Sequence, residues 1–544
     1  MYLERIEIRG FRGINRLSLH LDQVTALIGE NTWGKTSLMR ALWCLLGQDE
    51  VPYQFVPEDF HRPADPELAD VVHLQLILSF REHRPEMSQH SHRLARLAAV
   101  WVKHKDQLHR IHYRAAADLQ ADGSVLSEHG FLDSNGQPLP LDNPLHLIQL
   151  LMLMNPVLRL RDSRANRGNQ MVVAEGQQRL MDLANTLAED PQSVPRAELK
   201  QGFESVCQLI SHYFSSVPPI RSRPRSQRDI VMRPASLRGL GSLTDLVRCQ
   251  DNQVMQLALS GIAGAMLAAR GDRQIEEGAR PILILEDPES RLHPTMLALA
   301  WGLLEQLPGQ KILTTNSGDL LTSLPLGQLR RLVRNQVETR CYQLHDDHFS
   351  ADDLRRIAFH VRINRPMSLF ARCWLLVEGE TEIWLLAELA NICGYSLRAE
   401  GVRIIEYAQC GYAPLIKVAK QLGIEWHLMA DGDQAGEKYI TGARALLHGD
   451  RERERLTGLH ERDIEHFLFM NGFESVFRRE AKIGPRQSCS PHKIIDKAIR
   501  HRSKPGLALA VVEEAENLGP ESIPPLLRQM FARVVALARG QGEW

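Results

Sequence analysis

Short apolar stretches open the chain, and a helical pattern interrupts them. Alternation of apolar and polar residues over the first eleven positions predicts a β-strand, and similar stretches follow it. The spacing of the apolar residues over 35–47 instead predicts an amphipathic helix. The pattern therefore predicts two antiparallel meanders around a strand–loop–helix unit. The strand-like stretches lie at 2–11, 15–21, 24–29, 71–80 and 109–119.

The period of the pattern changes in the middle of the chain and near its end. Residues 176–215 and 252–270 have the spacing of helices. From 280 to about 345, apolar strands alternate with helices, which is typical of a parallel sheet. A second block of this kind follows, and beyond about 475 the pattern is helical. Its strands are predicted at 373–377, 402–406 and 426–430, and its helices at 381–393 and 411–422.

These patterns predict an α/β protein in three parts. The first part is residues 1–365, with a helical, arginine-rich insert at about 165–240. The second part is a parallel-sheet block at 366–475, and the third is a helical C-terminal region at 476–544. The arginine-rich stretch 219–238 allows two interpretations: a solvated loop, or a surface that contacts phosphates or a second subunit.

Composition excludes some classes of protein and leaves others open. A chain of 544 residues is too long for one ordinary core, which agrees with several domains. Its 65 basic and 66 acidic residues give a net charge of −1, which argues neither for nor against nucleic acid. No apolar run is long enough to span a membrane, and the charged, alternating N-terminus is unlike a signal peptide. The eight cysteines form no CxxC pair, which argues against a zinc site and fits a cytoplasmic protein.

A phosphate-binding loop lies between the third predicted strand and the helix after it. Gly29, Gly34, Lys35 and Thr36 have the GxxxxGK[ST] spacing in the strand–loop–helix context that this motif requires. Glycines let the backbone amides curl around phosphates, the lysine reaches the β- and γ-phosphate oxygens, and the threonine hydroxyl is a ligand of Mg²⁺. The loop therefore predicts that the chain binds ATP with Mg²⁺.

A second apolar strand ends in two acidic residues about 250 positions later. Glu286 is predicted to hold the Mg²⁺ shell, and Asp287 to orient the attacking water. The next strand ends in polar residues that place Asn316 beside the γ-phosphate. The predicted nucleotide contacts in these segments are Gly29, Asn31, Gly34, Lys35, Thr36, Ser37, Glu286, Asp287 and Asn316.

These motifs resemble those of the ABC-type ATPases of the SMC, RecF and OLD group. The resemblance implies a nucleotide held between two ATPase heads, and so a homodimer in which the second head supplies a Ser-Gly signature. Ser260 and Gly261 are the best candidates for this contact, and residues 238–245 are a rival. The chain departs from the group in the order of Glu286 and Asp287, and in Asn316, which replaces the usual histidine. Asparagine bonds phosphate without acting as a base near neutral pH, so slow or regulated hydrolysis is expected.

Acidic residues also end two strands of the second block. Glu378 ends the stretch "WLLVE", and Glu382 lies one helical turn later, able to face the same point. Asp431 and Asp433 follow the stretch "WHLMA", and residues two apart on an extended segment share a face. Four carboxylates at the ends of neighbouring strands would repel one another, and oxygen-rich clusters of this kind bind Mg²⁺ or Mn²⁺. In the same segment, Glu380 is expected to point elsewhere and Thr381 to cap the helix.

This second pattern resembles the TOPRIM domain of topoisomerases, primases and recombination nucleases. An ABC-type ATPase followed by TOPRIM is similar to the overcoming-lysogenization-defect (OLD) family of ATP-dependent endonucleases. The resemblance implies cleavage of DNA by two metal ions, with a role in phage defence or DNA repair. It adds Glu465, with Asp463 as its neighbour, to the metal ligands, and Lys504 as a cation that assists the transition state. A charged helix face and a solvated lysine are the alternatives for Glu465 and Lys504.

Two other classes of function compete with a nuclease. One is a RecF- or SMC-like DNA-binding ATPase switch whose TOPRIM block does not cut, although the carboxylate set is intact and no long heptad coiled coil is present. The other is a topoisomerase or primase, but no DNA-gate domain with a nucleophilic tyrosine is visible, and a primase needs no ABC-type ATPase. A metal-dependent DNA endonuclease is therefore the leading prediction.

Overall fold

A computed structural model of the chain describes residues 1–47, 51–62, 72–160, 279–290, 294–306, 309–335, 338–447 and 449–540. Its contacts divide the chain into two compact units. Unit 1 comprises residues 1–324 and 328–341, and unit 2 comprises 325–327 and 342–544. The predicted insert, the arginine-rich stretch, Ser260 with Gly261 and the rival segment 238–245 lie outside the described residues. The predicted boundaries at 365/366 and 475/476 stay predictions.

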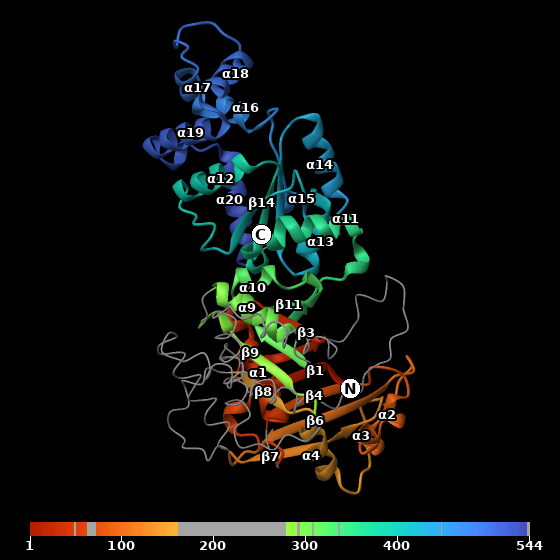
Figure 1. Ribbon diagram of the computed structural model, residues 1–544. Helices are drawn as coiled ribbons and strands as arrows, with labels where there is room; N and C mark the ends of the chain where they lie inside the picture. Colours follow the sequence, from red (N-terminus) through yellow and green to blue (C-terminus); the bar gives the residue numbers. More distant parts are fainter. Residues whose placement is uncertain are drawn as a thin grey trace, which may run out of the picture. The chain divides into compact units, whose positions relative to one another are not determined.

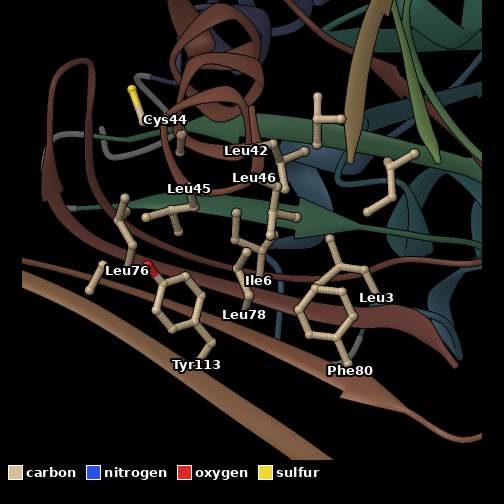
Figure 2. Packing of buried hydrophobic residues seen from close by; sticks show 14 of the residues in the cluster. Leu3, Ile6, Leu42, Cys44, Leu45, Leu46, Leu76, Leu78, Phe80 and Tyr113 are labelled. Carbon is tan, nitrogen blue, oxygen red and sulfur yellow. The ribbon is translucent and has the colours of Figure 1, made fainter. Parts of the chain in front are cut away.

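The first sheet of unit 1 is antiparallel, with the strand order β2-β1-β4-β6-β5 and β7 paired with β6. Alternation puts one face of each strand into the core, where α1 packs against it (Figure 2). The predicted meanders on either side of the loop form this one sheet, because β1 pairs with both β2 and β4. The strands are β1 Tyr2–Phe11, β2 Ile14–His20, β4 His73–Arg81, β5 Val102–Lys103, β6 His109–Leu119 and β7 Val125–Leu132.

The second sheet of unit 1 has the order β12-β11-β3-β10-β9-β8, and the four pairings from β11 to β8 are parallel. Strand β3 is buried at every position, as expected of a parallel strand covered on both faces. This confirms the parallel sheet predicted from 280 to about 345. Its strands are β3 Val24–Ile28, β8 Val157–Leu160, β9 Ile282–Glu286, β10 Gln310–Thr314, β11 Leu329–Arg334 and β12 Thr339–Tyr342. The helices of the unit are α1 Lys35–Leu46, α2 Met87–His90, α3 His92–Ala95, α4 Pro144–Met154, α9 Pro294–Gln306 and α10 Gly318–Thr322.

Unit 2 is built on a four-stranded sheet, β14-β13-β15-β16, in which every pairing is parallel (Figure 1). The carboxyl ends of all four strands therefore meet at one edge, where ligands bind in open α/β sheets. The strands are β13 Cys373–Val377, β14 Val402–Glu406, β15 Glu425–Ala430 and β16 Leu456–Gly458. The helices associated with them are α11 Ala351–Ile357, α12 Glu380–Ile392, α13 Tyr412–Gln421, α14 Gln434–Arg444, α15 Glu452–Arg455 and α20 Pro525–Ala538.

The C-terminal helices of unit 2 share a core with its sheet. Leu385 and Leu389 of α12 belong to the same buried cluster as Phe477 and Val511 of the C-terminal segment. These helices are α16 Ile464–Leu468, α17 Glu474–Glu480, α18 Pro491–Arg502 and α19 Lys504–Leu518. The cysteines that the structure describes are free, and no described helix is long and apolar enough to cross a membrane.

Candidate nucleotide site and candidate metal centre

The predicted phosphate-binding loop runs from the end of β3 to the start of α1, and its backbone needs glycine at two positions. Gly34 has φ 93° and Gly29 has φ 140°, conformations that other residues rarely adopt. A Cβ on Gly34 would lie 2.7 Å from a side-chain carbon of Ile14, and one on Gly29 would lie 2.6 Å from the Leu332 carbonyl oxygen. The two glycines therefore allow both the turn and its close packing on the neighbouring strands.

Lys35 joins this loop to the end of β10. Its side chain is buried, and its ammonium group donates to the carbonyl of Gly29 and, over 3.2 Å, to Oδ1 of Asn316. Burial lowers the pKa of Lys35, while the charges of Asp287 and Glu289 act to raise it. The side-chain amide of Asn316 also donates to Oδ1 of Asn31 over 3.3 Å. The fold thus brings Gly29, Asn31, Lys35 and Asn316 together, as a shared phosphate site requires.

Thr36 and Ser37 occupy the first turn of α1 with different surroundings. The Thr36 side chain is exposed, which leaves its hydroxyl accessible. The Ser37 hydroxyl instead accepts a hydrogen bond of 3.2 Å from the Gly13 amide, between β1 and β2. Ser37 therefore anchors the helix to the first sheet, and the contact with nucleotide stays a prediction for both residues.

Glu286 and Asp287 end β9 as predicted, but each has a partner that the sequence did not reveal. The Glu286 carboxylate accepts two hydrogen bonds from the guanidinium of Arg159 on the adjacent strand β8. Asp287 has φ 41°, and its carboxylate accepts a hydrogen bond of 3.0 Å from the Thr314 hydroxyl. Arg159 was missed because only the β8–β9 pairing brings it to Glu286. Because Arg159 holds the Glu286 carboxylate, a Mg²⁺ ion would have to compete with this arginine for it.

Glu289 is a further residue of this site that sequence reasoning missed. Its carboxylate accepts hydrogen bonds of 2.6 Å from the Asn316 amide and 2.9 Å from the Thr315 hydroxyl. The 3₁₀ turn Pro288–Ser290 carries it back toward the end of β10. Glu289 therefore fixes the backbone that presents Asn316 to Lys35.

In unit 2, the carboxyl ends of β13 and β15 carry the predicted carboxylates. Glu378 directly follows β13, and Asp431 directly follows the neighbouring strand β15. Glu382 is buried in the first turn of α12, and its carboxylate accepts a hydrogen bond of 2.5 Å from the Gly379 amide. Glu382 rather than Thr381 therefore caps this helix, because the Gly379 turn brings its carboxylate back onto that amide. Glu380 is exposed, which agrees with the prediction that it points elsewhere.

The remaining predicted residues come from later segments. Asp433 caps α14, and its carboxylate accepts a hydrogen bond of 2.7 Å from the Gly436 amide. Asp463 caps α16 and accepts from the His466 amide at 2.8 Å and from its Nδ1 at 2.6 Å. Glu465 is buried in α16, and the Lys504 ammonium lies 2.9 Å from its Oε1. Glu465 is thus buried and not on an exposed helix face, while Lys504 is about half exposed and paired with it, and the roles of both residues stay predictions.

Asp431 is subject to the charges of four other carboxylates. Burial raises the pKa of Asp431 to about 8, with further contributions from the charges of Glu382, Glu378, Asp463 and Glu465. Burial also raises the pKa values of Glu378 and Glu382. Four side chains from two segments of the chain, 378–382 and 463–465, thus act on one half-buried aspartate, which concentrates negative charge at the edge of the sheet.

Lys504 is the cation of this cluster. Burial acts to lower the pKa of Lys504, but the hydrogen bond and charge of Glu465 raise it overall. Its charge also acts to lower the pKa values of Glu378 and Asp463. The ammonium therefore offsets part of the repulsion between the carboxylates, and about half of its side chain remains exposed.

The oxygen atoms of this cluster suit a hard divalent cation. Oε2 of Glu378 and Oε2 of Glu465 are buried, and neither has a hydrogen-bond partner. A buried carboxylate oxygen without a partner is costly, and a cation would satisfy both. Glu382, Asp433, Asp463 and Lys504 are meanwhile held by protein groups. Accordingly, within the residues described, no three acidic, histidine or cysteine side chains are placed to hold one ion together.

Comparisons with known proteins agree with the two-part organisation. Residues 1–368 match the family model "Protein of unknown function (DUF2813)", and residues 369–433 match "Overcoming lysogenization defect protein-like, TOPRIM domain". The chain is 44% identical to the uncharacterized protein YbjD of Escherichia coli K12 over the full length of both. It is 22% identical to the OLD nuclease of Thermus scotoductus, over 91% of this chain and 94% of that one. It is 21% identical to endonuclease GajA of Bacillus cereus, over 82% and 78%.

Solved structures give weaker likenesses. The C-terminal region of the Burkholderia pseudomallei OLD protein is 19% identical and covers 31% of this chain and 99% of its own, with a TM-score of 0.26. The SMC head domain of Thermotoga maritima is 14% identical and covers 63% and 100%, with a TM-score of 0.31. Such scores carry no weight, and the α/β class rests on the strand order described above. The family models and the full-length relative place this chain in the DUF2813 family, with an OLD-like TOPRIM domain in its second half.

Proposed function

We propose that this protein is an ATP-binding, divalent-metal-dependent DNA endonuclease whose TOPRIM domain hydrolyses a phosphodiester. The observation that carries the proposal is that Glu378 and Asp431 end the paired strands β13 and β15, where the charges of Glu382, Asp463 and Glu465 also act on the half-buried Asp431. A cluster of this charge is stable only with protons or cations, and the buried oxygens of Glu378 and Glu465 are available to a cation. The names of the two distant relatives, an OLD nuclease and an endonuclease, support the same activity.

The residues of the cluster have separate roles: the carboxylates bind the cations, and the lysine offsets negative charge on the phosphate. Two bound Mg²⁺ or Mn²⁺ ions would activate a water and stabilise the leaving oxygen of the phosphodiester. Glu378, Asp431 and Asp433 supply oxygens at the edge of the sheet, and Glu382, Asp463 and Glu465 supply them from the adjoining helices. Lys504, half-exposed and bonded to Glu465, is placed to offset the negative charge that develops on the phosphate.

The nucleotide site is proposed to regulate the cleavage rather than to perform it. The Gly29–Lys35 loop would hold the phosphates of ATP, Thr36 its Mg²⁺, and Asp287 the attacking water. Asn316 lies against Lys35 but cannot serve as a base, so binding is expected to be more robust than turnover. Completion of this site by a second copy of the chain, through Ser260 of the partner head, is part of the proposal. So is a cytoplasmic location.

Plasmid cleavage tests the proposal directly. Supercoiled plasmid is incubated with the protein in Mg²⁺, Mn²⁺ or EDTA, with and without ATP. We expect cleavage that needs the cation and is lost in Glu378→Ala and Asp431→Ala. Glu380→Ala is the matched control, since this carboxylate is exposed in the same turn and should keep full activity. Cutting that persists in both variants would refute the assignment of the site.

A second candidate function is an ATP-dependent DNA-binding switch that does not cut. One observation favours it: four of the proposed ligand side chains or their neighbours are engaged by protein groups, and no described trio is placed to hold one ion. Metal titration separates the two candidates. Calorimetry with Mn²⁺ should detect binding that Asp431→Ala abolishes if the protein is a nuclease, and no such binding if it is a switch.

A further inference from the structure

Three tyrosines lie together at the carboxyl edge of the unit 2 sheet, beside the carboxylate cluster. Tyr407 directly follows β14, Tyr412 begins α13, and Tyr439 lies in α14. The ring centroids are 5.3 Å apart for Tyr407 and Tyr439, 5.6 Å for Tyr412 and Tyr439, and 6.2 Å for Tyr407 and Tyr412. Every ring therefore touches the other two, and α13 and α14 lie side by side in unit 2 (Figure 1).

Backbone hydrogen bonds fix this cluster next to Glu378. The Tyr407 amide donates to the Val377 carbonyl over 2.8 Å, and the Ala408 amide donates to the Glu378 carbonyl over 3.3 Å. The chain after β14 thus continues its pairing past the end of β13, as far as the backbone carbonyl of Glu378. Tyr439 is six residues beyond Asp433, on the helix that this aspartate caps.

The three tyrosines have different surroundings. Tyr407 is buried, and its hydroxyl donates to the Met429 carbonyl over 3.3 Å, so it forms the base of the cluster. Tyr412 and Tyr439 are partly exposed, and the structure gives neither hydroxyl a hydrogen-bond partner among the residues it describes. Their rings therefore present aromatic surface beside the acidic site. The Tyr412 hydroxyl packs against Gly442 of α14, so Tyr439 supplies the hydroxyl that a ligand can reach.

Gly442 of α14 leaves the space that the Tyr412 side chain occupies. A Cβ at this position of α14 would lie 1.9 Å from the Tyr412 hydroxyl oxygen. Only glycine lets the ring lie this close to the helix, because any larger residue would displace it. The cluster is thus a built surface and not an incidental contact of three side chains.

We propose that Tyr412 and Tyr439, supported by Tyr407, form a platform that stacks an unpaired nucleobase next to the phosphodiester held at the carboxylates. This inference rests on the proposed function, because the phosphodiester places the base within reach of the rings. Aromatic faces stack any base at a substantial gain in affinity, and a free hydroxyl bonds a base edge or a phosphate. A base inside a duplex cannot reach such rings, so the platform selects single-stranded or frayed DNA.

Photocrosslinking of the full-length protein tests the contact itself. Single-stranded oligonucleotides that carry 5-iodo-deoxyuridine at one position are bound in Ca²⁺, a hard cation with the same oxygen ligands, and irradiated. We expect the crosslinked peptides to contain Tyr412 or Tyr439 for at least one position of the label. Crosslinks found only at other residues would overturn the inference.

Affinity measured by fluorescence anisotropy gives the second readout. Tyr412→Leu/Tyr439→Leu should bind single-stranded DNA about tenfold more weakly than wild type and lose its preference over duplex. Tyr412→Phe/Tyr439→Phe keeps the rings and should retain most of the preference. Trp384→Leu is the control, since Trp384 is an exposed aromatic residue of α12 outside the cluster. Thermal unfolding identifies any variant that fails to fold. If the Leu pair does not fold, crosslinking of Tyr412→Phe/Tyr439→Phe at positions 412 and 439 is the test.

The outcomes separate this inference from the proposed function. Metal-dependent cleavage by wild type together with unchanged binding by the Leu pair would overturn the platform and leave the nuclease intact. Failure of wild type to bind DNA in any form would overturn the proposed function and the platform with it.

Discussion

The two candidate sites both lie at the carboxyl edge of a parallel sheet, yet they balance charge in opposite ways. In unit 1, Lys35 is bonded to Gly29 and Asn316, and Glu286 is held by Arg159. In unit 2, the charges of four carboxylates act on Asp431, Lys504 is bonded to Glu465, and two carboxylate oxygens are buried without partners among the described residues. The nucleotide site is thus complete in its charges, whereas the carboxylate site needs protons or cations.

This difference teaches how each site is expected to respond to its ligand. A nucleotide must displace interactions that already exist, so its binding can be coupled to movement of the β9 and β10 ends. A divalent cation instead removes a repulsion that the fold tolerates, so its binding should mainly stabilise the structure in place. Four variants or conditions test this comparison, beginning with the largest expected effect.

Replacement of Asp431 by asparagine should separate activity from stability. Asp431→Asn removes an oxygen ligand, so plasmid cleavage should fall by at least about 100-fold. The neutral amide has no charge to lose on folding, so the metal-free protein should gain about 1–2 kcal/mol in its free energy of unfolding. Cleavage assays and urea unfolding in EDTA measure the two effects. A variant that is both active and less stable would break the comparison.

Replacement of Arg159 tests whether this arginine balances the charge of Glu286 in unit 1. Arg159→Met leaves Glu286 without its cation, so unit 1 should lose about 2–3 kcal/mol of stability. Arg159→Met/Glu286→Gln should recover most of this loss, because the uncompensated charge is then absent. Urea unfolding without nucleotide measures both variants, and simple additivity of the two substitutions would contradict the proposed pairing.

A pH series separates the carboxylate cluster from the other strongly shifted group of unit 2. Burial lowers the pKa of His427 to about 4, and its ring bonds Glu454 and Thr457. The unfolded chain takes up a proton below about pH 6.5 while the folded chain does not, so stability falls with pH below that value. His427 alone should cost about 2 kcal/mol between pH 7 and pH 5, while the raised pKa of Asp431 acts in the opposite direction over the same range, so the histidine contribution is measured as the difference between wild type and His427→Gln. His427→Gln should remove this slope; an unchanged slope would assign it to other groups.

The smallest effect is expected at Glu289, whose carboxylate holds the end of β10. Glu289→Gln keeps an acceptor for the Asn316 amide but loses the charge, which should weaken that bond by about 1 kcal/mol. Affinity for ATP, measured by calorimetry, should fall about fivefold, against complete loss in Lys35→Ala. Unchanged affinity in Glu289→Gln would mean that the end of β10 needs no such support.

The sequence identified the acidic residues at the strand ends more readily than the residues that form hydrogen bonds or ion pairs at those ends. Glu378 and Asp431 were found because an acidic residue directly after a buried strand breaks the apolar pattern. The partners Arg159 and Glu289 leave no such signal, since an arginine in a strand and a glutamate in a turn are ordinary residues. Their roles arise from the β8–β9 pairing and from the turn after β9.

The first sheet shows the same limit at the level of the fold. Alternation predicted β1, β2, β4 and β6, and the structure has strands in these stretches, but β5 and β7 were not predicted. Their assembly into one sheet, with β3 in the other sheet of unit 1, was not predicted, because an alternating strand can pair with several partners. The aromatic cluster likewise joins residues 407, 412 and 439, whose spacing follows no helical or strand period.

What the sequence determined by itself is local chemistry: the phosphate-binding loop, the acidic strand ends and the α/β order of the elements. These features depend on short segments, in which residues that are close in the sequence are also close in space. What only the tertiary structure decided is which charges face one another, because strand pairing and helix packing join segments far apart in the chain. That is why Asp431 and the four carboxylates that act on it could be named from their own segments, while their action on one another is established only by the fold.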